Sequence, residues 1–142
     1  MIGPLENVRD ARDRYLAASG FTTDSYTDPN FVIKLGFIKL RFANPGLLPF
    51  HDLHHVATGY DASFIGEAEI SAFELRSGWG TPLILLLCCG SILMAIFISP
   101  VRLWRAWKKA RSVRSLYGTK TPYEALLAMN VGELRALMGI EG

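Results

Sequence analysis

HDLHHVATGYDASFIGE, from His51 to Glu67, is the stretch around which the rest of the chain can be interpreted. It contains all three histidines of the 142-residue protein, at positions 51, 54 and 55. If the stretch begins as a helix, His51 and His55 are four residues apart and project from the same face. Two imidazoles at this spacing can chelate one cation.

Two carboxylates extend this histidine pair to a candidate set of four metal ligands. Asp52 adjoins His51, and Glu67 follows His55 after eleven residues, which is enough for the chain to return on a second helix. Such a set suits zinc first, and also iron, manganese or cobalt. His54 points about 100° away from His55 on a helix, so we predict a supporting or surface histidine and not a ligand.

The spacing resembles the metal motif of the coenzyme Q (ubiquinone) biosynthesis protein four family, which reads His-Asp, two residues, His, eleven residues, Glu. The segments HDLHHVATGY, GEAEISAFELRSG and VGELRALMGI resemble family segments in the same order, so the likeness covers about residues 34–140. Only 50 residues precede the motif, which we interpret as a reduced N-terminal region compared with full-length members. The matched ligand positions are His51, Asp52, His55 and Glu67.

The resemblance implies a function in ubiquinone biosynthesis. The implied substrate is a polyprenylated hydroxybenzoate whose ring carbon 1 loses a carboxylate and gains a hydroxyl by oxidative decarboxylation. A non-catalytic scaffold that presents the prenylated lipid to other ubiquinone biosynthesis proteins is the alternative. The implied location is the cytoplasmic face of a bacterial inner membrane, or the matrix face of the inner mitochondrial membrane, and a homodimer is possible.

A third hypothesis is a zincin-like hydrolase. HDLHH resembles HExxH, with Asp52 in place of the glutamate that acts as general base. Aspartate is shorter by one methylene and suits the role of ligand better, so we rank this hypothesis below the other two.

Two helices are predicted to carry the candidate site. The first runs over about Leu47 to Thr58 and ends at Gly59, and the second runs over about Ala62 to Arg76. Glu67 interrupts the apolar face of the second helix, which favours a ligand there because an unpaired buried carboxylate is costly. A salt bridge to Arg76 is the alternative. Glu74, seven residues after Glu67, is predicted to support a ligand.

The remaining segments are predicted from their breakers and caps. A helix is expected over 5–19 with Gly20 as its end, and a loop over 21–30. Residues 31–44 fit either a short extended stretch or an irregular helix. Near the end of the chain, residues 121–124 and 130–133 fit the capping-box pattern, and Gly139 can close the last helix.

Seventeen uncharged, mostly apolar residues lie between Pro82 and Pro100. Seventeen is at the lower limit for a membrane-spanning helix. The alternatives are a buried central helix and a helix with one apolar face toward lipid. We favour a long central helix, capped by Thr81, whose small residues around Gly90 and Ser91 line a cleft for a prenyl tail.

The segment VRLWRAWKKARSVR, residues 101–114, combines six cations with two tryptophans and no acid. It belongs to a basic C-terminal part, since residues 101–142 contain eight Lys/Arg and three Asp/Glu. A helix that lies on an anionic membrane fits this pattern better than a nucleic-acid-binding helix. We expect the cations on one side and the tryptophans on the other. The predicted lipid contacts here are Arg102, Trp104, Arg105, Trp107, Lys108 and Lys109.

Length and composition predict one domain over 1–142. Half of the residues are apolar, which suffices for a single core. The expected fold is all-α, with five to seven helices around the apolar helix and a membrane-binding side.

Overall fold

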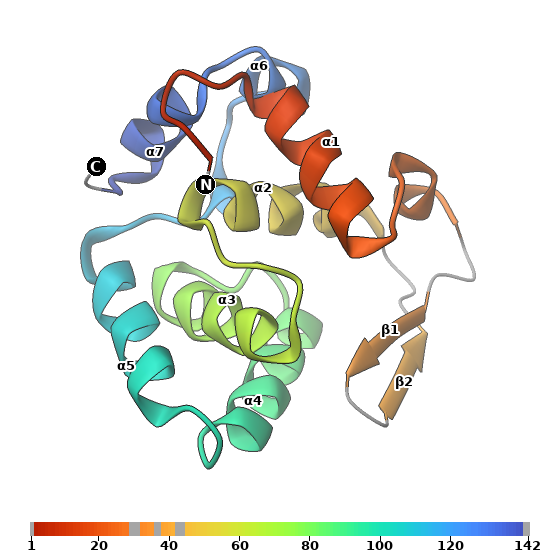
Figure 1. Ribbon diagram of the computed structural model, residues 1–142, viewed down its shortest axis with the longest axis vertical. Coiled ribbons are helices and arrows are strands. Elements are labelled where there is room, and N and C mark those ends of the chain that lie inside the picture. Colours follow the sequence, from red (N-terminus) through yellow and green to blue (C-terminus); the bar gives the residue numbers. More distant parts are fainter. Residues whose placement is uncertain (1, 29–31, 36–37, 42–44, 141–142) are drawn as a thin grey trace.

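The computed structural model describes residues 2–28, 32–35, 38–41 and 45–140. Seven α-helices occur in these ranges, and the all-α prediction is confirmed at the level of fold class (Figure 1). Between the first and second of these helices the chain also contains a short antiparallel pair of strands. The sequence did not decide between an extended stretch and an irregular helix there. The helices are α1 (Val8–Ser19), α2 (Leu48–Thr58), α3 (Phe64–Ser77), α4 (Pro82–Ala95), α5 (Pro100–Lys109), α6 (Tyr123–Leu127) and α7 (Val131–Met138); the strands are β1 (Val32–Leu35) and β2 (Ile38–Arg41).

Helix α2 lies at the centre of the molecule. Figure 1 shows α1, α6 and α7 above it and α3 below it, with α4 and α5 flanking α3 on the outer side. From Asp52 to Thr58 every residue of α2 is buried. The largest apolar cluster therefore joins both ends of the chain to the motif helix. Its fully buried members include Val8, Leu53, Val56, Ile70, Phe73, Leu116, Leu126, Val131 and Leu134.

Most helix ends follow the predicted chemistry. Gly20, Gly59 and Gly139 have positive φ angles at the ends of α1, α2 and α7. Asn130 makes a full capping box with Glu133, as predicted. The box predicted for residues 121–124 is wrong, because α6 begins after Pro122 and has no side-chain cap. The α1 and α3 helices begin slightly later than predicted, after the caps Asn7 and Ser63.

The apolar helix is shorter and less central than predicted. Thr81 caps α4 and Pro82 occupies its first turn, but the helix ends at Ala95. A helical conformation is disfavoured immediately before proline, and Pro100 starts the next helix. Contacts of α4 are mainly with α3, while Leu86 and Leu93 on its other side are exposed. None of the helices in the described ranges has the length and apolarity needed to cross a membrane.

Candidate metal centre

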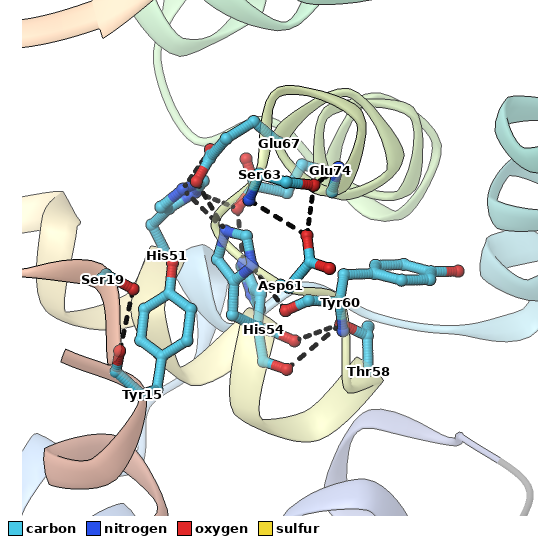
Figure 2. Close-up of polar contacts among 12 residues, drawn as sticks. Tyr15, Ser19, His51, His54, Thr58, Tyr60, Asp61, Ser63, Glu67 and Glu74 are labelled. Carbon is cyan, nitrogen blue, oxygen red and sulfur yellow. Dashed lines mark hydrogen bonds and ion pairs between the residues drawn. The ribbon is translucent and has the colours of Figure 1, made fainter. Parts of the chain in front are cut away.

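Three predicted ligands converge at the junction of α2 and α3. His51 Nε2 lies 3.2 Å from His55 Nε2. Glu67, from the first turn of α3, places its Oε2 atom 3.4 Å from His51 Nε2 and its Oε1 atom 3.5 Å from His55 Nε2. Figure 2 shows the Glu67 side chain directed toward His51. These three side chains can hold one metal ion.

The hydrogen bonds at the far side of each imidazole decide which ring nitrogen is available. His55 Nδ1 lies 2.9 Å from the Tyr60 carbonyl oxygen, which can only accept, so this nitrogen carries the proton. His51 Nδ1 lies 2.9 Å from Glu74 Oε1, which likewise accepts. In the neutral, metal-binding form of the two rings, both Nε2 atoms would therefore present lone pairs to each other. A cation between them removes the repulsion, and ligating histidines are commonly oriented in this way.

The separations also fit a tetrahedral ion. Ligand atoms about 2.0 to 2.1 Å from a tetrahedral cation are about 3.3 Å from one another. The Nε2–Nε2 separation of 3.2 Å matches this value, and each histidine has a different Glu67 oxygen at 3.4 or 3.5 Å. With one ligand atom taken from each residue, the three atoms lie within 4.8 Å of one another. A rotation of the Glu67 carboxylate would bring one oxygen closer to both histidines, and one coordination position would remain for water or a substrate.

Asp52 does not join this group. It follows His51 directly, and successive residues on a helix diverge by about 100°. Its Oδ2 atom accepts a hydrogen bond of 2.6 Å from the Tyr26 hydroxyl, in the short helical turn Thr23–Tyr26. The structure therefore narrows the predicted four ligands to three, with Asp52 in the wall of the cavity beside His51 and Glu67.

The turn between α2 and α3 brings Glu67 to the histidines. Gly59 ends α2 at φ 81°, a conformation that suits glycine. Asp61 then accepts from the Ser63 amide, and Ser63 caps α3. Gly66 is needed for this close return, because a Cβ there would clash with the Asp61 carbonyl oxygen. Glu67 thus lies in the first turn of α3, where a helix favours negative charge.

Glu74, two turns after Glu67, is the hub of a buried polar network. One oxygen, Oε1, accepts from His51 Nδ1 at 2.9 Å, from His54 Nδ1 at 2.7 Å and from the Tyr117 hydroxyl at 2.7 Å. The side chain is 1% exposed. Burial opposes its ionisation, but the nearby charge of His51 and these hydrogen bonds outweigh that effect and hold the pKa of Glu74 below its usual range. The predicted supporting role of Glu74 therefore has a geometric basis.

His54 supports the site from inside the core. Its Nε2 atom accepts a hydrogen bond of 2.8 Å from the Leu116 amide, so its proton is on Nδ1 and is donated to Glu74. Burial lowers the pKa of His54, which favours the neutral ring. The supporting prediction is right and the surface alternative is wrong. Leu116 and Tyr117 were missed as part of the site, since nothing in their local sequence indicates partners more than forty residues away.

The charges and ring contacts agree with this arrangement. Without a bound ion, burial opposes protonation of His51, but the charge of Glu74 and hydrogen bonds to Glu67 and Glu74 hold the pKa of His51 well above its usual value. Burial likewise opposes ionisation of Glu67, but the charge of a protonated His55 and hydrogen bonds from Nε2 of both histidines hold the pKa of Glu67 well below its usual value. A divalent cation would take the place of these Nε2 protons. Tyr15 stacks on His55 with ring centroids 4.8 Å apart, which fixes the plane of that imidazole (Figure 2 labels Tyr15). The alternative salt bridge from Glu67 to Arg76 does not form, because Arg76 lies over the Trp107 ring.

Two cavities meet at the candidate metal ligands. The larger has a volume of about 810 Å³ and is bounded by α1, the Thr23–Tyr26 turn, α2 and the start of α3. The smaller, about 60 Å³, lies between α2, α3 and α4. His51 and Glu67 line both. Apolar or aromatic residues dominate the remaining walls, including Tyr15, Leu16, Phe21, Tyr26 and Leu48 in the larger cavity and Ile84, Leu87 and Cys88 in the smaller one.

The two predicted prenyl-tail contacts on α4, Gly90 and Ser91, lie in different surroundings. Ser91 is buried and lines the small cavity. Gly90 lines neither of these two cavities and lies, by helical spacing, on the outward side of α4 between Leu86 and Leu93.

The predicted division of α5 into a cationic side and a tryptophan side is wrong. Trp104 is exposed, whereas Trp107 is half-buried under Arg76. Arg102 makes a two-bond ion pair with buried Glu69, and Lys109 donates to the Thr58 carbonyl. These two cations therefore contribute to the stability of the fold through contacts within the chain.

Arg105 and Lys108 remain on the surface. Within the described ranges neither has an ion-pair or hydrogen-bond partner. They are therefore the members of the predicted cationic set that are available to another molecule.

Comparisons with known proteins leave the family open. No protein-family model matches the chain, and no curated protein matches it.

Proposed function

We propose that this protein is a divalent-metal protein of ubiquinone biosynthesis that acts on a polyprenylated hydroxybenzoate-type intermediate. The observation that carries the metal assignment is the meeting of His51, His55 and Glu67, with both Nδ1 atoms already engaged. The substrate class comes from the resemblance of the motif and its flanking segments to the coenzyme Q biosynthesis protein four family. Zinc is the proposed ion, since two imidazoles and a carboxylate form a familiar open zinc site.

The cavities provide room for such a substrate. A volume of about 810 Å³ lies in the range of small-molecule sites, and its aromatic and aliphatic walls suit a substituted ring. We place the polar ring head beside His51 and Glu67. The prenyl tail would leave along the apolar wall formed by Leu48, Ile84 and Leu87. That route widens only if side chains on α4 move, because the smaller cavity measures about 60 Å³.

The proposed reaction breaks the bond from ring carbon 1 to the carboxylate and releases carbon dioxide. A carbon–oxygen bond replaces it, so the substrate undergoes a two-electron oxidation for which dioxygen is the proposed oxidant. One oxygen atom enters the ring product, and the other leaves as water after it takes two protons and two electrons from an external two-electron donor. A bound cation would hold the carboxylate or phenolate and stabilise developing negative charge. The chain would contribute the apolar side chains of the cavity wall against the ring, and the Asp52–Tyr26 pair as a polar contact for the ring substituents.

The test is turnover by purified protein loaded separately with zinc, iron, manganese and cobalt. A short-chain prenylated hydroxybenzoate is supplied with dioxygen and a two-electron donor, and mass spectrometry follows a product that has lost the mass of carbon monoxide. We expect product from the wild type and none from Glu67→Ala. Binding of the compound without product from any metal form would contradict the enzyme proposal and favour a prenyl-lipid-presenting scaffold.

One observation favours a second candidate, a metal hydrolase related to the zincins. Asp52 is not among the three converging ligands and lines the same cavity, as a general base following the first histidine would. Hydrolysis of a broad ester and peptide library by the zinc form, lost in Asp52→Asn with metal retained, would support this candidate. Absence of hydrolysis together with turnover of the prenylated acid would eliminate it.

A further inference from the structure

The corner formed by α4 and α5 concentrates exposed apolar side chains. Of the thirteen large hydrophobic residues that are exposed in the described ranges, eight lie between positions 83 and 104. On α4 they follow one stripe, in which Leu86 is 69% exposed and Leu93 is 67% exposed. Single exposed apolar residues are ordinary, but such a concentration marks an interaction surface. The eight are Leu83, Leu86, Leu93, Ile96, Phe97, Ile98, Val101 and Trp104.

The tip of this corner is the most apolar part. Residues 96–99 connect the two helices, and Figure 1 shows this turn at the lower extremity of the molecule, below α3. Phe97 is 90% exposed there, with Ile98 beside it. The chain does not fold these side chains inward, although α3 lies close by. A protruding apolar tip suits penetration into a soft medium better than contact with a flat protein surface.

The charged residues of the corner and its flanking segments are all cations. Residues 75–114 contain seven Lys/Arg and no Asp or Glu, and the one cation of α5 that pairs with an acid within the described ranges is Arg102, which binds Glu69 of α3. On α5 the exposed stripe continues from Val101 and Trp104 into Arg105 and Lys108, which have no partner in the described part of the chain. Tryptophan and cations behind an apolar tip match the layers of a membrane interface, with acyl chains deepest and anionic headgroups above them.

We infer that the α4–α5 corner docks on the surface of an anionic membrane, with Phe97 and Ile98 in the acyl-chain boundary and Arg105 and Lys108 at the phosphates. A second copy of the chain fits this surface less well. A two-fold contact would place the same cations of both copies against each other, and a protruding tip buries little area. The inference is independent of the reaction proposed above.

The first test is flotation of the purified full chain with vesicles of phosphatidylcholine mixed with phosphatidylglycerol. Phe97→Ser combined with Ile98→Ser should lower vesicle binding about tenfold or more, since the larger part of two apolar side chains leaves the bilayer. Leu5→Ser is the matched control, because Leu5 is 89% exposed but lies before α1. Equal binding by the double variant and the wild type would overturn the inference. Metal content and circular dichroism verify that each variant is folded.

The second test concerns charge. Arg105→Glu combined with Lys108→Glu should weaken binding to the mixed vesicles by about tenfold or more, and added salt should weaken wild-type binding in the same direction. Lys120→Glu, an exposed site outside the corner, is the control and should bind as the wild type. Sedimentation velocity distinguishes a membrane from a second copy of the chain as the partner of this surface. A wild-type dimer that the Phe97/Ile98 variant converts to monomer, with vesicle binding unchanged, would assign the corner to a second copy and refute membrane docking.

Discussion

Glu74 holds His51 by a hydrogen bond of 2.9 Å between Oε1 and Nδ1, and both residues face the junction of α2 and α3. The carboxylate fixes the ring so that Nε2 points toward Glu67 and His55. The availability of this ligand atom therefore depends on a residue that does not bind the metal itself.

Removing a ligand should remove the metal. His55→Ala and Glu67→Ala each eliminate one of three converging donors, so most of the bound metal should be lost. Asp52→Asn should keep nearly the wild-type stoichiometry, because the asparagine oxygen can still accept from Tyr26. Elemental analysis of the purified proteins measures this. Equal metal loss in Asp52→Asn and Glu67→Ala would restore Asp52 as a ligand.

Neutralising Glu74 should weaken metal binding without removing a ligand. Glu74→Gln loses the charge that orients and polarises the His51 ring, and the expected loss in affinity is about 10- to 100-fold. Competition with a fluorescent chelator gives the affinity. Glu69→Gln is the control on the same helix, because Glu69 pairs with Arg102 and touches none of the histidines. An unchanged affinity in Glu74→Gln would show that His51 is oriented by its packing alone.

Metal removal should destabilise the fold, since the site joins α2 to α3. By mass action, a free metal concentration of about 100 Kd contributes about 2.7 kcal/mol to the free energy of unfolding. Melting curves with excess zinc and with a chelator should therefore differ clearly in the wild type. The same two curves should coincide for His55→Ala. A shift of equal size in that variant would place the stabilising metal elsewhere.

His54→Ala should lower the free energy of unfolding but should leave most of the metal bound. It leaves the Leu116 amide without its acceptor and removes a donor from Glu74, for an expected loss of about 2 to 4 kcal/mol in the free energy of unfolding. Urea unfolding at saturating zinc measures this loss. The metal content of the folded fraction should remain well above that of His55→Ala, and the reverse order would make His54 a ligand.

The contribution of His54 to stability should depend on pH. Burial lowers its pKa in the folded state, so between the folded value and the ordinary value of about 6.5 the unfolded chain binds more protons. The stabilisation is therefore complete above about pH 6.5 and is lost as the pH falls through that range. The difference in unfolding free energy between wild type and His54→Ala, measured without metal, should shrink from pH 7.5 to pH 5. A difference that grows toward acid pH would contradict the neutral assignment.

The sequence alone was sufficient for the three converging ligands because their placement is local. His51 and His55 share a helical face, Gly59 permits the reversal, and Ser63 starts the helix that returns Glu67. Asp52 lies outside the converging group, and spacing cannot reveal that Tyr26, 26 residues earlier, donates to it. Local pattern has no information about such distant partners.

The helical elements were predicted better than their environment. Apolar composition indicated a helix after Thr81, but a run without polar residues has no preferred face, so its peripheral position on α3 could not be foreseen. On α5 the cations looked equivalent in sequence. Arg102 found Glu69, and Lys109 found a backbone carbonyl, only because the fold brought these groups within reach.

A single oxygen of Glu74 accepts hydrogen bonds from His51, His54 and Tyr117, so the candidate metal centre is connected to residues outside it. Through His54, that oxygen is linked to the amide of Leu116, 62 residues further along the chain. An ion bound at His51 should restrict one end of this linkage, and we expect the exchange rate of the buried Leu116 amide at the other end to fall. The occupancy of the centre could thus be followed at Leu116 by hydrogen–deuterium exchange, on a segment that never touches the ion.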